Sequence, residues 1–115
     1  MGSFAVGTVV LVLFPFSDLS DAKRRPALII ADSGSDDWIL CQITSRPYSD
    51  SRAIRISDDD FDEGGLDRES YVRPGKLFTA NGSIIAKVVG VLNQEIFRDI
   101  IEEVIDLISP TENEP

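Results

Sequence analysis

Apolar residues form three runs in the first part of the chain, and each run predicts a buried strand. Residues 7–14 (GTVVLVLF) are β-branched and apolar and are closed by Pro15. Residues 25–31 and 38–44 (WILCQIT) have the same character. The turn-forming segment 33–37 (SGSDD) separates the last two runs, so we expect them to pair as an antiparallel hairpin.

Shorter runs complete the predicted sheet. Residues 53–56 alternate in polarity, and residues 87–92 read as a last strand with Gly90 at a bulge. Residues 70–72 and 76–79 look extended on either side of Pro74-Gly75, and together they count as one strand. The segments between the strands are predicted as loops at 14–25 and 57–70 and as a turn or short helical turn at 80–83.

The period of the pattern changes near the end of the chain. Apolar residues recur there at helical spacing over about fifteen residues, with Asn93 as the N-cap and Pro110 beyond the end. The apolar positions are Ile96, Phe97, Ile100, Ile101, Val104, Ile105 and Ile108. Six short strands and one amphipathic helix predict a mainly β (α+β) fold, in which a small barrel or highly curved sheet is closed by the helix.

Charge is distributed unevenly along the 115 residues, a length that suits one domain. The net charge of −9 argues against nonspecific nucleic-acid binding. However, residues 1–56 hold six acidic and six basic residues, whereas residues 57–115 hold fourteen acidic and five basic ones. A locally positive surface built from the first half of the chain therefore remains compatible with the composition.

Residue types exclude several classes of chemistry. The chain has no His, so a Ser/His/Asp triad and other His-based catalysis are excluded. The single Cys41 argues against a disulfide framework and against a zinc site, and it suits a reducing cytoplasm. The longest apolar run, 9–14, is far shorter than the roughly 20 residues of a membrane helix. The N-terminus lacks the pattern of a signal peptide, and we expect a cytoplasmic protein.

Several segments, taken in order, resemble one known family. They are GTVVLVLFPFSDLS, KRRPALII, CQITS, SYVRPGKLFT, KVVGVL and the C-terminal helix. This ordered set resembles the MazF/PemK family of toxins from type II toxin–antitoxin systems over about residues 5–108. The resemblance implies an SH3-like β-barrel, a homodimer, and sequence-specific cleavage of single-stranded RNA without a metal or cofactor. It also implies a cognate antitoxin that blocks the RNA groove. We expect a single domain over residues 1–110, followed by a polar tail at 111–115.

The resemblance also assigns the catalytic residues. The family's catalytic Arg precedes the Pro that opens the second strand, a position held here by Arg25. The family's catalytic Thr or Ser ends the third strand, where Thr44 stands with Ser45 beside it. Several members carry an acid, followed by Gln, where this chain has Gly75-Lys76, so the general base is in question. An Arg of some members matches Arg73.

These residue types suit attack by the 2′-OH of RNA. A guanidinium matches phosphate oxygens and stays charged, so Arg25 would stabilise the phosphorane. The Thr44 hydroxyl would hydrogen-bond the phosphate or the 2′-OH. Without His, either Arg25 also serves as the acid or the base is weak, and turnover is slow. The ordinary alternatives are that Arg25 caps carbonyls or pairs with Asp18 or Asp21, and that Thr44 satisfies a turn.

A wider set of side chains is predicted to bind RNA. Lys23 and Arg24 would contact phosphate from the 14–25 loop, or form surface pairs. Tyr48 is a candidate for stacking on a base, whereas Phe16 and Trp38 are more often core residues. The full predicted RNA-binding set is Lys23, Arg24, Ser45, Arg46, Tyr48, Arg73 and Lys76.

Two rival functions fit the same sequence. The missing acid and the negative net charge suit a binding module of this fold that has lost cleavage. A toxin that poisons DNA gyrase through protein–protein contact is the other rival, and its function would lie in the C-terminal helix. The RPALII and ITS segments favour the nuclease.

Overall fold

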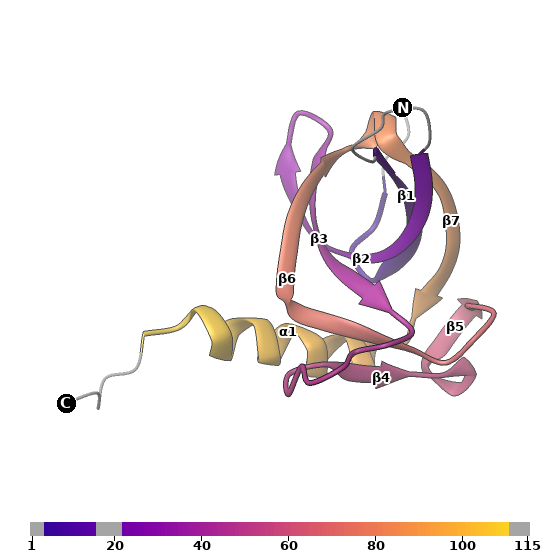
Figure 1. Cartoon of the computed structure of the whole chain (residues 1–115). Helices are drawn as coiled ribbons and strands as arrows, with labels where there is room; N and C mark the ends of the chain where they lie inside the picture. Colours follow the sequence, from indigo (N-terminus) through magenta and orange to yellow (C-terminus); the bar gives the residue numbers. More distant parts are fainter. Residues whose placement is uncertain (1–3, 16–21, 111–115) are drawn as a thin grey trace.

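The computed structural model describes residues 4–15 and 22–110 and contains one sheet and one α-helix (Figure 1). All neighbouring strands of the sheet are antiparallel, in the order β4-β6-β3-β2-β1-β7-β5. The strands are β1 (Thr8–Pro15), β2 (Ala22–Gly34), β3 (Asp37–Thr44), β4 (Ile54–Ile56), β5 (Phe61–Gly64), β6 (Ser70–Asn81) and β7 (Ile85–Leu92), and the helix is α1 (Gln94–Ile108). The predicted mainly β fold with a C-terminal helix is confirmed, with seven strands in place of six.

The sheet curls into a half-barrel and buries apolar side chains on both faces (Figure 1). Successive residues of a strand point to opposite faces, so Val9 and Val10 enter different cores. The inner core consists of Val10, Val12, Ala27, Ile29, Trp38, Leu40, Ala80 and Ile85. The helix-side core consists of Val9, Leu28, Cys41, Ile43, Ile56, Val72, Leu92, Ile100 and Val104.

The β2–β3 hairpin has the short turn that its sequence predicts. Ser35 and Asp36 adopt φ values of 56° and 62°. Two successive residues with positive φ make a tight turn whose twist matches that of the flanking strands. Asp32 stabilises the turn, because its side-chain Oδ1 accepts a hydrogen bond of 2.9 Å from the Gly34 amide.

Strand β2 begins three residues earlier than the sequence predicts. Lys23 pairs with Phe14 and Arg24 with Leu13, so both cations lie on a strand and not in a loop. The prediction of a loop over all of 14–25 is therefore wrong at its C-terminal end. Pairing with the apolar end of β1 outweighs the low strand propensity of a charged segment.

Strand β5 is absent from the prediction, which has a loop over 57–70. The structure places a short 3-10 helix, Asp58–Asp60, and then β5 in this segment. Phe61 pairs with Leu92 of β7. The two strands approach closely because Gly90 has no side chain: a Cβ there would lie 2.7 Å from Cδ2 of Phe61. The register of β7 also shifts beside Gly90, so the predicted bulge is confirmed.

Strand β6 continues through Pro74 as one strand with a bulge. Leu77 pairs with Cys41 of β3, yet Arg73 pairs with the next residue, Gln42. Residues 74–76 therefore lie outside the ladder, which suits a proline that has no amide hydrogen to donate. Arg73 therefore precedes the interruption in the ladder, and Lys76 lies within it.

Helix α1 packs one face against the helix-side core and extends away from the sheet at its C-terminal end (Figure 1). Its N-cap is confirmed, because Asn93 Oδ1 accepts a hydrogen bond of 2.9 Å from the Ile96 amide. Ile100 is fully buried, whereas Ile105 and Ile108 near the far end are 52% and 66% exposed. Among the described residues, no helix is long and apolar enough to cross a membrane.

The buried face of α1 gives a test of how the helix packs against the sheet. Ile100→Ala should lower the free energy of unfolding by about 2–5 kcal/mol, because it leaves a cavity in the helix-side core. Ile105→Ala makes the same chemical change at an exposed position and should cost much less. Urea unfolding followed by circular dichroism measures both. Equal losses in the two variants would contradict the assignment of the buried face.

Candidate functional site

The register of β2 and β3 brings Arg25 and Thr44 to the same end of the hairpin, two residues beyond its last paired residues, Ala27 and Gln42. Ala27 pairs with Gln42 in this hairpin, and the same antiparallel register, carried two residues further, aligns Arg25 with Thr44. Directly opposite residues of antiparallel strands project to the same face. The start of β2 and the end of β3 therefore bring the two predicted catalytic residues together, although they are 19 positions apart in the sequence.

Arg25 and Thr44 line one cleft of about 320 Å³. Three further members of the predicted site, Lys23, Arg24 and Ser45, line the same cleft. The side chains of Lys23, Arg24 and Arg25 are all exposed. Asp18 and Asp21, the alternative partners of Arg25, lie outside the described residues. The five predicted residues thus bring three cations and two hydroxyl groups to one cleft.

The pleat of β2 separates the three cations. Lys23 pairs with Phe14 and Arg25 with Val12, and both partners belong to or pack against the inner core. Arg24 pairs with Leu13 and projects to the opposite face. Lys23 and Arg25 therefore share a face with Thr44, while Arg24 lies on the opposite face of the strand with Leu11 and Pro26 of the cleft lining.

The Thr44 hydroxyl already closes a turn. Its Oγ1 accepts a hydrogen bond of 3.1 Å from the Arg46 amide and donates one of 3.3 Å to the Arg46 carbonyl. A hydroxyl has one donor and two acceptor positions, so one acceptor position remains. In this arrangement Thr44 can accept a hydrogen bond from an incoming hydroxyl, whereas donation to a phosphate would require it to release Arg46.

The loop between β5 and β6 adds residues that the prediction missed. Asp67 and Arg68 line the same cleft as Arg25 and Thr44. Asp67 is the one acid among the described residues that line it. The sequence offered only an acidic loop, which reads most simply as a solvated surface, and no local pattern indicated that this loop reaches the strand ends.

Three of the four remaining predicted residues line a second, more open hollow of about 430 Å³. Tyr48, Arg73 and Lys76 line it together with Arg52 and Asp50. Arg46 is exposed in the turn after β3 and lines neither the cleft nor the hollow. The predicted site is therefore divided, because the cleft collects the ends of β2 and β3 while the hollow forms between the β3–β4 loop and the bulge of β6.

A nearly buried ion pair holds Arg73 in the hollow. Arg73 Nε donates a hydrogen bond of 2.7 Å to Asp50 Oδ2, and its Nη1 donates one of 3.3 Å to Gln42 Oε1. The side chains of Arg73 and Asp50 are only 22% and 15% exposed. The hydrogen bond from Arg73 is the main reason that the pKa of the Asp50 carboxyl lies below its usual range.

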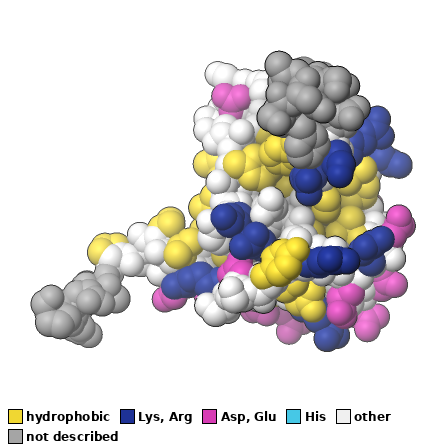
Figure 2. Space-filling view, viewed as in Figure 1, with side chains coloured by type: hydrophobic (Ala, Val, Ile, Leu, Met, Phe, Trp, Pro, Cys, Tyr) yellow, Lys and Arg dark blue, Asp and Glu magenta, His cyan; other side chains and the backbone are white. Residues whose placement is uncertain are grey.

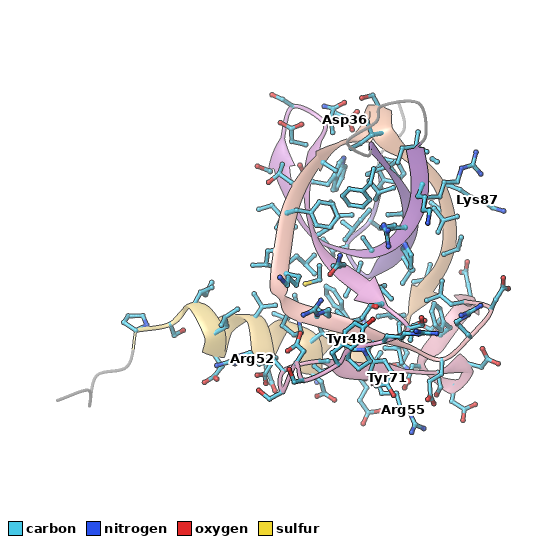
Figure 3. The ribbon with its side chains drawn as sticks, in the orientation of Figure 1. Asp36, Tyr48, Arg52, Arg55, Tyr71 and Lys87 are labelled. Atoms are coloured by element: carbon cyan, nitrogen blue, oxygen red, sulfur yellow. The ribbon has the colours of Figure 1, made fainter. Side chains whose placement is uncertain are left out.

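The β3–β4 loop is also tied to α1. Arg52 Nη1 contacts Glu103 Oε2 at 2.6 Å and Asp106 Oδ2 at 3.1 Å. The amide of Arg52 donates a hydrogen bond of 3.0 Å to Asp50 Oδ1, so the Asp50 carboxylate bridges Arg52 and Arg73. Tyr48 lies in the same loop, two residues before Asp50, and is labelled with Arg52 in Figure 3.

Basic side chains gather on one face of the molecule. Figure 2 shows Lys and Arg side chains in a band across the front, at the height at which β3 ends in Figure 1. Acidic side chains in that view lie mostly along the lower edge. The net charge of the chain therefore does not describe the surface around the strand ends.

Trp38, the other described aromatic residue considered for stacking, lies in the core. Trp38 is 5% exposed in the inner core, and its ring centroid lies 5.6 Å from that of Phe4 in an edge-to-face contact. The expectation that Trp38 is a core residue is confirmed. Phe16 lies outside the described residues.

Comparison with known proteins agrees with this fold. A family model described as PemK-like, MazF-like toxin of type II toxin-antitoxin system matches residues 5–108. The chain belongs to this toxin family. No curated protein matches it in sequence.

Solved structures of MazF/PemK-type proteins share the fold at low sequence identity. The MazE-MazF crystal structure (Form-III) from Deinococcus radiodurans has a TM-score of 0.73 at 15% identity, over 92% of this chain and 96% of that one. An endoribonuclease in complex with its cognate antitoxin, from Mycobacterial species, has a TM-score of 0.71 at 14% identity, over 96% and 98%. The Mycobacterium tuberculosis toxin MazF-mt6 has a TM-score of 0.66 at 15% identity, over 89% and 98%.

The Asp50–Arg73 pair gives this MazF/PemK-type fold a defined pH response. Because the pKa of Asp50 is lowered in the folded state, its contribution to stability is present above the unfolded pKa of about 3.9 and is lost as the pH falls through the folded pKa. Urea unfolding should show that Asp50→Asn is less stable than wild type at pH 7, with a gap that shrinks below about pH 4. Asp99→Asn, at an exposed helix position, is the control. A gap independent of pH would refute the role of this pair.

Proposed function

We propose that this MazF/PemK-type toxin is a sequence-specific endoribonuclease that cleaves single-stranded RNA, mRNA in particular, without a metal. The observation that carries the proposal is the shared cleft of Arg25 and Thr44, which come from two strands and face the same side. Family membership supports it, and one of the similar structures is described as an endoribonuclease in complex with its cognate antitoxin.

The proposed reaction uses the 2′-OH of the substrate as the nucleophile. The 2′-oxygen attacks the adjacent phosphorus, the P–O5′ bond breaks, and the 5′-oxygen leaves with a proton from water. The products are a 2′,3′-cyclic phosphate and a 5′-hydroxyl. Arg25 neutralises the charge that builds on the phosphorane oxygens. Thr44 positions the scissile phosphate by donating its hydroxyl proton to a phosphate oxygen on releasing the Arg46 carbonyl, which leaves the proton of the 2′-OH for a separate base.

The proton of the 2′-OH also needs an acceptor. The family position for an acid holds Gly75 here, and Gly75 lines the hollow, not the cleft. Asp67 is the carboxylate that lines the cleft beside Arg25 and Thr44. We assign it the role of general base, since a carboxylate within reach of the nucleophile serves this purpose.

The assembly and partners follow the same proposal. We expect a homodimer, a cognate antitoxin that blocks the RNA groove, and action in the cytoplasm. The exposed apolar residues at the end of α1, Ile105 and Ile108, are surfaces that a second copy or the antitoxin would cover. A gyrase-poisoning toxin would place its function on α1 instead, whereas the shared cleft of Arg25 and Thr44 supports a function at the strand ends.

The direct test is RNA cleavage in EDTA. Wild-type protein should cut a long single-stranded RNA at a short motif, and sequencing of the fragments should show 5′-hydroxyl ends. Arg25→Ala should lower the rate by about 10²–10³-fold, because it removes stabilisation of the transition state. Thr44→Ala should lower it by about tenfold, the value of one hydrogen bond.

Arg98→Ala is the matched control for loss of one cation, because Arg98 is exposed on α1 and lines neither the cleft nor the hollow. It should cleave at the wild-type rate. No cleavage by wild type in any buffer would refute the nuclease. Wild-type cleavage by Arg25→Ala would refute the residue assignment. Growth arrest that persists in Arg25→Ala would favour the gyrase-type rival.

The role of Asp67 has its own test. Asp67→Asn should lower kcat by about 10²–10⁴-fold, as expected for loss of a general base, and should remove the rise of kcat with pH at the acidic side of the profile. Binding of a non-cleavable RNA with a 2′-deoxy scissile position should be unchanged. Asp99→Asn is the control for loss of one acid. A kcat that keeps the wild-type pH profile in Asp67→Asn would assign the proton to another group.

A further inference from the structure

The hollow beside the cleft has features that cleavage at Arg25 and Thr44 does not require. Its lining combines one exposed aromatic residue, Tyr48, with the cations Arg52, Arg73 and Lys76. Tyr48 is 84% exposed, which is a high value for an aromatic side chain with no partner to cover it among the described residues. An aromatic ring beside several cations is the combination that binds single-stranded nucleic acid.

The backbone at Tyr48 is held in an unfavourable conformation. Its φ is +55°, in the left-handed region that bulky residues rarely occupy, and residues in that region cluster at ligand sites. The loop keeps this shape because Asp50 anchors it to Arg73 and Arg52 anchors it to Glu103. The exposed ring is therefore presented by a fixed loop.

The cations of the hollow differ in the hydrogen-bond donors that they keep for a ligand. Asp50 and Gln42 engage Arg73 through Nε and Nη1, and its outer nitrogen, Nη2, keeps donors on the other edge of the fork. Lys76 is exposed in the bulge of β6. Arg52 is directed to the acids of α1. Lys76 and the outer edge of Arg73 are thus the groups that suit a phosphate.

The hollow is close enough to the cleft to share one strand of RNA. Thr44 in the cleft and Tyr48 in the hollow are four residues apart, so their Cα atoms are separated by at most about 14 Å. Thr44 also pairs with Tyr71 of β6, and Arg73 lies two residues further along that strand. A single RNA strand that crosses the end of β3 would therefore reach both the cleft and the hollow.

We propose that this hollow is a second nucleotide-binding subsite, in which a base flanking the cleaved position stacks on Tyr48 while its phosphate is bound by Lys76 and Arg73. The inference rests on the proposed nuclease function and assigns the hollow to affinity and sequence context. The chemical step stays in the cleft. RNA fits better than a protein partner because the exposed lining offers a ring and cations, with its one carboxylate engaged by Arg73 and by the Arg52 amide.

Two substrates distinguish the contribution of the hollow from that of the cleft. One is a long RNA with a single cleavage motif, and the other is the same RNA trimmed to the motif. Tyr48→Ala should raise KM for the long RNA by about 5- to 150-fold, the range of one stacked base, and leave kcat unchanged. The trimmed RNA should show no difference. Tyr48→Phe keeps the ring and should restore wild-type KM. Arg98→Ala is again the control.

Binding of a labelled non-cleavable RNA, measured by fluorescence anisotropy, tests the hollow without cleavage. Lys76→Ala should reduce the slope of log Kd against log salt by about 0.7–0.9, as expected for loss of one phosphate contact, while Arg98→Ala keeps the slope. If wild type binds but never cuts, the nuclease fails and these binding results still decide the subsite.

Three outcomes would overturn the subsite. The first is that Tyr48→Ala keeps wild-type KM and Kd for the long RNA. The second is that it lowers kcat on the trimmed RNA, because the ring would then act at the reacting phosphate. The third is that Tyr48→Ala and Lys76→Ala leave RNA binding intact and weaken only antitoxin binding, because the hollow would then serve a protein.

Discussion

In the central strands β1, β2 and β3 both faces of the curled sheet are buried, and this constraint decides where their charged side chains can lie. A strand that faces a core on each side has no solvent face along its length, so polar groups are confined to strand ends, edges and loops. Arg25 stands just before the buried part of β2, and Thr44 just after that of β3. Antiparallel pairing sets the start of one strand beside the end of the next, so the two groups meet in one cleft.

The second polar region depends on a different interaction, the Asp50 carboxylate. One oxygen binds the Arg73 side chain of β6, and the other binds the Arg52 amide. Because Arg52 also reaches Glu103 of α1, the β3–β4 loop is fixed between the sheet and the helix. An ion pair with little exposure is costly to break from one side, so this arrangement holds the loop in one shape. The fixed shape offsets the strain at Tyr48 and keeps its ring in solvent.

Much of the fold could be predicted because local patterns and tertiary packing agree. The β2–β3 hairpin, the last strand with its bulge at Gly90 and the capped helix were correct. The errors fall where long-range pairing overrides local composition. Strand β5 contains one apolar residue, Phe61. It forms because it pairs with β7, which it can approach closely at Gly90. The charged start of β2 is extended because β1 pairs with it. Such pairings lie between residues far apart in the chain and leave no local pattern.

For the candidate site, the amino-acid sequence specifies which residue types are present: an Arg before a strand-opening Pro, a Thr at a strand end, and no His anywhere in the chain. These types limit the chemistry, because each side chain has fixed donors, acceptors and charge. Which of them meet depends on how the chain folds. The tertiary structure placed Asp67 in the cleft and moved Tyr48, Arg73 and Lys76 to a separate hollow. Distance between side chains is set by strand register and loop anchoring, and both of these arise from contacts between segments remote in sequence.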